Sequence, residues 1–404
     1  MGIFSNGNVT NGIPTAKPST SLWDLDASQV KVTLTDAPKV IPPLESLKFG
    51  QVMTDHMIVA TFHPQTGWSI PEIKPYGPIC LDPASSCFHY STSVFEGMKA
   101  YMGADGKTRL FRPELNMARI KRSVDRVALP AFNTGALITL IRRLVTIEER
   151  WIPKLSGYSL YIRPTVIGTR PGKLVFLTSL GVTASDQAML YVICSPAGPY
   201  FRSGMRPTSL LAVGENVRAW PGGTGCYKLS LNYGSTMKPL KDAERQGYNQ
   251  VLWLLGEQVT EAGAMNFFVV VKRDDDGWDV ITPALDGTIL PGVTRDSCLA
   301  LMAAHPSRTI LPQIPDGVCL HPQERTITMS DLVQWDTEGR LLEAFSVGTA
   351  AIVTAVGRIG YNGKDIRIPD YEGGPGPVAK ALYERILEIQ DGRVKWEGWS
   401  TICA

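Results

Sequence analysis

The chain has 404 residues, long enough for two domains with buried cores, and its hydrophobic content of 44% and charged content of 19% are ordinary for a globular protein. A formal net charge of +2 gives no electrostatic reason to expect nucleic acid or an acidic membrane surface as a partner. No apolar run approaches the ~20 residues that a membrane-spanning helix requires.

The first 45 residues are rich in Ser, Thr, Asn, Gly and Pro, and we predict a flexible arm over 1–45. They lack the basic and apolar segments of a signal peptide, and the first arginine of the chain is Arg109, whereas mitochondrial transit peptides are rich in arginine. Seven scattered cysteines without a CxxC pair fit a reducing compartment and predict neither disulfides nor a metal site. We therefore expect a cytoplasmic protein, with the mitochondrion as the less favoured alternative.

Residues 46–197 form a predicted small α/β domain. Strands are expected over 57–62, 159–163 and 188–194, and apolar spacing predicts helices over 116–127 and 137–151. A Pro- and Gly-rich break follows, and we place an interdomain linker at 198–208.

Residues 209–404 form a predicted larger domain in which strands alternate with helices. The strands are expected over 209–213, 250–255, 266–271 and 351–356, and the helices over 236–246, 294–304 and 377–389. The chain is therefore predicted to be an α/β protein of mixed α+β character with two domains.

The most informative short run is 222–234, in which three glycines precede Lys228 and Tyr233 follows. Glycines let the backbone approach a ligand closely, and a lysine beside them can donate to a phosphate or act as a nucleophilic amine. A solvated lysine on a glycine loop is the alternative. The run lacks the Gly-Lys-Ser/Thr ending of a P-loop, which argues against a nucleotide-binding protein.

Two further segments could belong to a cofactor site. The run 290–295 precedes a predicted helix, so the amides of Val293 and Thr294 would lie at a helix N-terminus, where a phosphate binds. An ordinary helix cap is the alternative. Glu261 lies between two predicted strands, either as a solvated loop charge or as a buried carboxylate that faces a ring nitrogen and keeps it protonated.

Other segments suggest carboxylate binding. Tyr161 and Arg163 alternate along a strand and share a face, so an inward Arg163 could bind a carboxylate, with a surface salt bridge as the alternative. Small residues over 346–351 offer backbone amides to a second carboxylate, or form a tight turn. The aromatic run 88–97 could line a pocket or belong to the core.

Together these segments resemble the branched-chain-amino-acid aminotransferases, which are pyridoxal 5′-phosphate enzymes of fold type IV. The resemblance covers about 47–390 and is specific, because separate motifs recur in the family's order. The motifs include Phe49-Gly50, Val94-Phe-Glu-Gly-Met-Lys99, Leu110-Phe-Arg-Pro113 with Arg119, Leu160-Tyr-Ile-Arg-Pro164, Arg218-Ala-Trp220, Asn232-Tyr-Gly234, Thr260-Glu261, Leu290-Pro-Gly-Val-Thr294 and Gly348-Thr-Ala350. It implies a small N-terminal α/β domain and a larger C-terminal domain with a β-barrel-like core.

The resemblance also assigns roles to positions of this chain. Lys228 matches the catalytic lysine that forms a Schiff base with the cofactor, Tyr233 the tyrosine near its phenolic oxygen, and Glu261 the carboxylate at its pyridine nitrogen. Arg119, Val293 and Thr294 match the phosphate ligands, and the amides of Thr349 and Ala350 those that receive the substrate α-carboxylate. Arg163, with Tyr161 and Tyr90, matches the set for the side-chain carboxylate of glutamate. The family's apolar walls around a branched side chain are matched by Phe49, Phe95, Tyr161 and Tyr200.

The implied activity is transamination of leucine, isoleucine and valine with 2-oxoglutarate, which gives branched 2-oxo acids and glutamate, in a homodimer. The alternatives are a fold type IV aminotransferase for D-amino acids or (R)-amines, a paralogue in specialised metabolism, and a non-catalytic protein on the same scaffold. Tyr161 and Arg163 favour the branched-chain interpretation over the first of these, and the retention of Lys228 and Glu261 argues against the last.

The chain departs from the family at three places. Residues 172–178 are inserted in a loop that, in the family, reaches over the neighbouring subunit's active site. Ala264 stands where a threonine is common beside the substrate, and Leu229-Ser-Leu231 replaces a commonly glycine-rich stretch beside the lysine. Ala351 and Thr354 occupy the places of the redox CxxC of animal members, so thiol-based regulation is not expected there.

Overall fold

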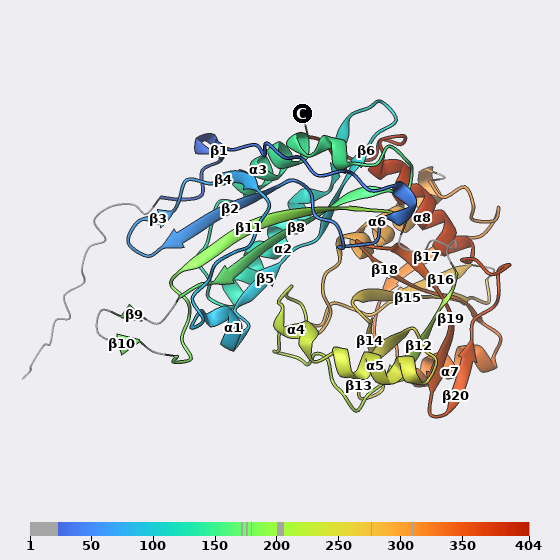
Figure 1. Cartoon of the computed structure of the whole chain (residues 1–404). Coiled ribbons are helices and arrows are strands. Elements are labelled where there is room, and N and C mark those ends of the chain that lie inside the picture. The colour runs from blue at the N-terminus through green and yellow to red at the C-terminus, as the bar shows by residue number, and fades with distance from the viewer. Residues whose placement is uncertain are drawn as a thin grey trace, which may run out of the picture.

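Two β-sheets organise the protein in the computed structural model (Figure 1). The structure describes residues 23–170, 173–174, 177–178, 180–199, 206–275, 277–308 and 310–403. Among these, no helix is long and apolar enough to cross a membrane.

The first sheet belongs mainly to the N-terminal half, in the path order β1-β4-β2-β11-β8-β6-β7-β21, with β3 beside β2 and β5 beside β8. Its strands are β1 (Lys31–Val32), β2 (His56–His63), β3 (Gly67–Trp68), β4 (Glu72–Pro75), β5 (Ser93–Phe95), β6 (Met98–Met102), β7 (Thr108–Phe111), β8 (Ser159–Gly168), β11 (Ala188–Ala197) and β21 (Ser400–Ile402). A separate two-stranded sheet is formed by β9 (Lys173–Leu174) and β10 (Leu177–Thr178). The strand β21 returns from the C-terminus to pair with β7, so both halves of the sequence contribute to this sheet.

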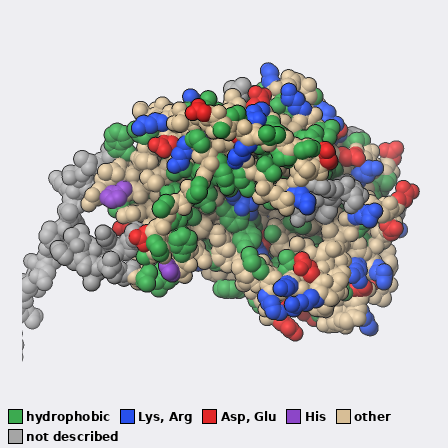
Figure 2. Space-filling model, viewed as in Figure 1, with side chains coloured by type: hydrophobic (Ala, Val, Ile, Leu, Met, Phe, Trp, Pro, Cys, Tyr) green, Lys and Arg blue, Asp and Glu red, His purple; other side chains and the backbone are tan. Residues whose placement is uncertain are grey.

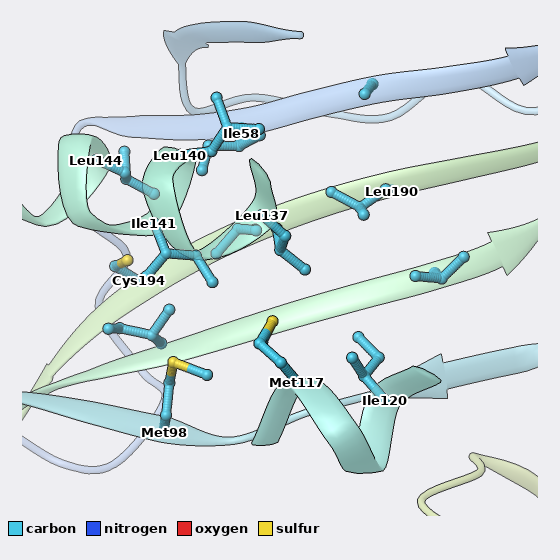
Figure 3. Packing of buried hydrophobic residues seen from close by; sticks show 14 of the residues in the cluster. Ile58, Met98, Met117, Ile120, Leu137, Leu140, Ile141, Leu144, Leu190 and Cys194 are labelled. Atoms are coloured by element: carbon cyan, nitrogen blue, oxygen red, sulfur yellow. The ribbon is translucent and has the colours of Figure 1, made fainter. Parts of the chain in front are cut away.

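Two helices cover one face of the first sheet, α2 (Pro113–Arg126) and α3 (Thr134–Ile147). Figure 3 shows Met117 and Ile120 of α2, and Leu137, Leu140, Ile141 and Leu144 of α3, pointing at the sheet. On α3 these apolar residues recur at the spacing of one helical face, and the Asn133 side chain caps the helix by accepting from the N–H of Ala136. The short α1 (Ser86–Tyr90) lies at one end of the sheet.

The ends of two predicted helices differ from the structure for local reasons. Helix α2 begins three residues early because Pro113, at its first position, has a fixed φ suited to a helix and no N–H to satisfy. Helix α3 ends at Ile147 rather than 151, and a short 3-10 turn (Glu149–Trp151) follows. The carboxylate of the buried Glu148 accepts hydrogen bonds from His56 and from the N–H of Asp55, and these contacts replace another helical turn.

The second sheet closes on itself. Its path β14-β13-β12-β19-β18-β15 is joined end to end by pairing of β14 with β15, which makes a six-stranded barrel and confirms the predicted barrel-like core. The strands are β12 (Thr208–Val213), β13 (Gln250–Leu255), β14 (Gln258–Ala262), β15 (Met265–Lys272), β18 (Leu341–Gly348) and β19 (Ile352–Tyr361), extended by β16 (Trp278–Thr282), β17 (Leu320–Glu324) and β20 (Lys364–Arg367).

The barrel strands alternate between two cores. On β15, Phe267 and Val269 pack with Leu332 of α7 (Met329–Thr337), whereas Phe268 and Val270 face the helices α6 (Val293–Arg308) and α8 (Pro377–Gln390). The core that contains α6 and α8 also takes in Tyr101 and Phe111 of the first sheet. The core that contains α6 and α8 is therefore built from residues of both halves. The remaining helices, α4 (Leu231–Gly234) and α5 (Met237–Arg245), lie beside the barrel.

The described part of the predicted arm, residues 23–45, contacts the first sheet. Strand β1 pairs in parallel with β4, and the N–H of Lys39 donates to the carboxylate of Asp55. The predicted linker begins after β11 ends at Ala197, and much of it lies outside the described residues.

Candidate active site

Lys228 lies between the two halves, and its backbone is held by the first sheet. The N–H of Phe95 donates to the Lys228 carbonyl at 3.2 Å, and the N–H of Ser230 donates to the Ser93 carbonyl at 3.0 Å. Leu229, between them, is fully buried in the core of the first half. The departure from the family at 229–231 thus supplies an apolar anchor beside the lysine.

The Lys228 side chain points at an aromatic pair. Its Nζ lies 3.4 Å from the Tyr233 hydroxyl and 5.0 Å from the centre of the Phe95 ring. Its backbone N–H donates to Oγ of the buried Ser123 of α2, at 2.9 Å. The amine is therefore fixed at its base by hydrogen bonds and placed beside a phenol.

A cavity joins Lys228 to residues from distant parts of the sequence. It is lined by Arg119, Lys228, Glu261, Ala264, Asn266, Leu290, Gly292, Val293, Thr294, Val347, Gly348 and Thr349. The structure thus brings five of the six predicted cofactor residues to one cavity. The sixth, Tyr233, does not line this cavity, but its hydroxyl contacts Nζ of Lys228.

Glu261 is buried at the same cavity as Lys228, and Arg218 is its ion-pair partner. Its Oε1 accepts from the Leu290 N–H at 3.1 Å and from Asn266 at 3.3 Å. Its Oε2 lies 2.5 Å from Nη1 of Arg218, yet accepts no well-directed hydrogen bond within the described structure. Burial raises the pKa of Glu261 above its usual value, and the Arg218 charge opposes this shift only in part.

Arg119 is held by a second buried carboxylate. Its Nε and Nη2 donate to the two oxygens of Glu96 at 2.6 and 2.8 Å, and its Nη1 donates to the Pro291 carbonyl at 3.1 Å. Burial acts to raise the pKa of Glu96, but Arg119 outweighs it, and the pKa lies below its usual value. Arg119 is thus a fixed cation at the cavity wall.

Helix α6 begins at the cavity with Val293 and Thr294. The first N–H groups of a helix have no partner within it and attract anions. A side chain at Gly292 would place a Cβ 2.1 Å from Oδ1 of Asn266, so glycine is required for this approach. Asn266 in turn donates to the carbonyl of Leu290 at 2.9 Å and holds the turn before the helix.

A second group of predicted residues contacts Phe95, whose ring lies 5.0 Å from Nζ of Lys228. The Arg163 guanidinium lies 4.8 Å from the Phe95 ring and donates to the Tyr161 hydroxyl at 2.9 Å. Phe49 packs edge-on against Tyr161, with ring centres 4.6 Å apart. These four residues form an aromatic cluster with one guanidinium, in which Tyr161 and Arg163 share a face as predicted.

The turn between β18 and β19 carries Thr349 and Ala350. The Thr349 hydroxyl donates to the Gly97 carbonyl at 3.4 Å, and Nζ of Lys99 donates to the Ala350 carbonyl at 2.7 Å. Thr349 lines the cavity that also contains Lys228. The turn therefore joins the barrel to strand β6 at the edge of the site.

Two predicted substrate residues are not placed with the others. The Tyr90 hydroxyl, at the end of α1, donates to the Leu180 carbonyl, and no described contact links it to Lys228. Tyr200 lies outside the described residues, as do residues 172, 175 and 176 of the insertion, whereas 173–174 and 177–178 form β9 and β10.

Sequence reasoning missed several polar residues that build the site. Glu96 is a charged residue between apolar neighbours in 94–98, which is itself a signal of a buried, paired charge. Arg218 belongs to a motif of the resemblance that gives it no role. Asn266 and Ser123 carry no sequence signal, because their contacts depend on the fold.

The chain is similar to known proteins over nearly its whole length. Residues 93–358 match the family model described as amino-transferase class IV. The mitochondrial branched-chain-amino-acid aminotransferase of Schizosaccharomyces pombe is 45% identical over 93% of this chain and 85% of its own length. The cytosolic enzyme of Saccharomyces cerevisiae is 43% identical over 95% of this chain and 98% of its own. The chain belongs to the branched-chain-amino-acid aminotransferase family.

Solved structures of branched-chain aminotransferases share the fold. The Escherichia coli protein gives a TM-score of 0.63 at 21% identity, over 86% of this chain and 99% of that one. The Thermobaculum terrenum protein, solved in its pyridoxal 5′-phosphate form, gives a TM-score of 0.64 at 20% identity, over 86% of this chain and 98% of that one. Both show a fold type IV architecture like that of this aminotransferase, whose class uses pyridoxal 5′-phosphate.

The cavity of this aminotransferase fits that cofactor chemically. An amine at Lys228, a fixed cation at Arg119 and the N-terminus of α6 suit an aldehyde and a phosphate. The buried Glu261 Oε2, which lacks a well-directed donor, suits a protonated ring nitrogen.

Proposed function

We propose that this aminotransferase transfers the amino group of leucine, isoleucine and valine to 2-oxoglutarate, with Lys228 as its catalytic residue. The observation that carries the proposal is the pair of surroundings that Lys228 contacts. It lines the cavity with Arg119, Glu261 and the start of α6, and its Nζ lies 5.0 Å from the Phe95 ring, which the Arg163 guanidinium also contacts.

The cofactor site is assigned to the chain's own residues. Bound there, pyridoxal 5′-phosphate supplies an electron sink for the charge that develops at the substrate Cα. Arg119 and the N–H groups of Val293 and Thr294 bind the phosphate, and Tyr233 lies beside the lysine to orient the phenolic oxygen. Glu261 Oε2 accepts the hydrogen bond of the ring nitrogen and favours its protonated form.

Lys228 moves the proton. Its Nζ, 3.4 Å from the Tyr233 hydroxyl, would take the proton from the substrate Cα as a general base and give the same proton to the cofactor carbon C4′ as a general acid. The hydrogen bond from its backbone N–H to Ser123 fixes the backbone from which this side chain extends.

The pocket of Phe49, Phe95 and Tyr161 encloses an apolar branched side chain, while Arg163 binds the distal carboxylate of glutamate or 2-oxoglutarate. Nε of Arg163 is buried and has no described hydrogen-bond partner, so a carboxylate would relieve an unsatisfied donor. The backbone amides of Thr349 and Ala350 receive the α-carboxylate that both substrates share.

We also propose a homodimer in which Tyr90 serves the partner's pocket. Apolar side chains gather on the surface around α1 (Figure 2), and Phe88 of α1 and Leu180 are each about 60% exposed, at 61% and 60%. The hydrogen bond from the Tyr90 hydroxyl to the Leu180 carbonyl joins α1 to the segment that contains Leu180. Exposed apolar clusters of this kind mark association surfaces.

The cellular compartment stays a prediction. Of the two relatives named above, one is a mitochondrial enzyme and the other a cytosolic enzyme.

The test is an amino-donor screen with the purified protein, pyridoxal 5′-phosphate and 2-oxoglutarate. We expect glutamate formation from leucine, isoleucine and valine, and little from D-amino acids, (R)-amines or aromatic donors. The Lys228→Ala variant should lose at least about 1,000-fold in kcat, because both the covalent amine and the proton carrier are removed. Wild-type turnover by this variant, or a preference for D-amino acids, would refute the proposal.

A further inference from the structure

Lys99 lies beside the substrate-carboxylate turn, and the proposed function gives it no role. It belongs to β6, is 6% exposed, and its Nζ donates to the Ala350 carbonyl at 2.7 Å. No ion pair of Lys99 occurs within the part of the chain that the structure describes, and burial lowers the pKa of Lys99 to about 7. The buried Lys99 amine thus has a backbone carbonyl as its partner.

The turn that Lys99 contacts is strained. Ile352, two residues after Ala350, is 5% exposed and has a φ of +65°, in the left-handed region that β-branched residues avoid. Such a conformation persists when its surroundings over-determine it. Two hydrogen bonds join the turn to segment 97–99 of the other half. The Thr349 hydroxyl donates to the Gly97 carbonyl, and Nζ of Lys99 donates to the Ala350 carbonyl.

A purely stabilising role does not explain a lysine at this position. Burying an ammonium without a carboxylate is unfavourable, and an apolar side chain of similar length would avoid that cost. Residues that lower stability are commonly retained for function. A second cavity is lined by Lys99 among others, and it shares Val293, Thr294 and Thr349 with the proposed cofactor cavity.

We infer that Lys99 is a positioning residue that holds the Ala350 carbonyl, so that the amides of the turn face the substrate α-carboxylate. The inference rests on the proposed function, which assigns this carboxylate to Thr349 and Ala350. Lys99 contacts the turn through the Ala350 carbonyl, and in this inference it acts on the substrate only through the turn. Its removal would leave the strained turn free to relax away from the binding conformation.

The experiment compares Lys99→Met, which keeps length and removes charge, with the control Lys121→Met. Lys121 is exposed on α2 of the same half. The protein loaded with pyridoxal 5′-phosphate is titrated calorimetrically with 4-methylpentanoate, which has the leucine skeleton and a carboxylate but no amine. The neutral 4-methylpentanamide is titrated in parallel.

We expect Lys99→Met to raise the Kd for 4-methylpentanoate at least about tenfold, as for loss of a hydrogen bond to a charged group. The Kd for the amide and for the cofactor should stay within twofold, and the thermal midpoint should be unchanged or higher. Lys121→Met should match the wild type in every measurement.

An unchanged Kd for 4-methylpentanoate would overturn the inference, as would an equal loss of cofactor affinity and thermal stability. Failure of the wild-type protein to bind 4-methylpentanoate would count against the proposed function itself, so the two ideas fail by different results.

Discussion

Arg163 places a single charge in a pocket made of aromatic rings. Its guanidinium lies 4.8 Å from the Phe95 ring and 5.1 Å from the Tyr161 ring, which stabilises the cation without neutralising it. An apolar side chain can therefore pack on the rings while the charge is held aside by the Tyr161 hydroxyl. This arrangement would let one site accept a branched side chain and a carboxylate in turn, as the proposed function requires.

The Arg163→Gln substitution should separate the two substrates. We expect kcat/KM for 2-oxoglutarate to fall roughly 100-fold, since a charge-assisted bond to the distal carboxylate is lost, and kcat/KM for leucine to fall less than about threefold. Steady-state kinetics with each substrate varied in turn measures this split. Arg143→Gln, at an exposed position of α3, is the matched control. Equal losses for both substrates would show that Arg163 has a structural role instead.

Two buried carboxylates of the site have opposite pKa shifts, and the difference matches their roles. Both oxygens of Glu96 accept hydrogen bonds from Arg119, and Asn116 adds another at 2.7 Å, so its pKa is lowered despite burial. Glu261 keeps an oxygen without a well-directed donor, and burial raises its pKa. The first carboxylate anchors an arginine, whereas the second is ready to accept a proton-bearing ligand.

At the scale of elements, helix α8 depends on a carboxylate from another strand. Its N-cap, Gly376, has no side chain to cap the helix, and Glu343 of β18 accepts from the N–H groups of Val378 and Ala379 at 2.8 and 3.0 Å. A Cβ at Gly376 would lie 2.3 Å from the Glu343 carboxyl carbon, which makes glycine necessary there. Burial raises the pKa of Glu343 to about 7, although the two N–H groups act to lower it.

This pKa predicts a pH dependence of stability. The folded protein binds a proton at Glu343 up to about pH 7, whereas the unfolded chain releases it near the ordinary value of 4.5. The contribution of Glu343 is therefore present below about pH 4.5 and is lost as the pH rises to about 7, by roughly 3 kcal/mol at most.

Glu343→Gln removes the ionisable group, although it leaves one acceptor for the two N–H groups, and should remove that dependence. The urea unfolding midpoint of the wild type should be lower at pH 8 than at pH 5, and that of the variant should change less between the two pH values. Parallel changes of both midpoints with pH would contradict the assigned ionisation.

Local pattern predicted the elements better than their ends or their contacts. Helical spacing located α2, α3, α5, α6 and α8, and β13 has the predicted bounds, because one buried face is enough to specify each. Strand β8 extends past the predicted end through Pro164, since its pairing changes there from β6 to β5. The closure of β14 on β15 and the pairing of Glu96 with Arg119 could not be predicted locally, because they join segments that only the fold brings together.

At the scale of the whole molecule, the proposed homodimer can be tested by substitution on the surface around α1. Phe88→Asp should place a charge in the proposed interface and weaken dimerisation at least about 30-fold, a cost typical of a central interface residue. Sedimentation velocity across a dilution series measures the shift to monomer, and activity per molecule should fall with it, since Tyr90 would no longer reach a partner. The control Val333→Asp changes a 43% exposed residue of α7. A monomeric wild-type protein with full activity would rule out the shared site.

The anchoring of Leu229 in the first half has a consequence for engineering. The proposed catalytic lysine belongs to the barrel half of the sequence, but Val94 and Phe95 of β5 set where its backbone lies. A chimera that joins one half of this chain to the other half of a relative would inherit its lysine from one parent and the lysine's alignment from the other. We therefore expect such a chimera to work better when 93–95 is exchanged together with the barrel half, so that 93–95 and 228–230 come from the same parent.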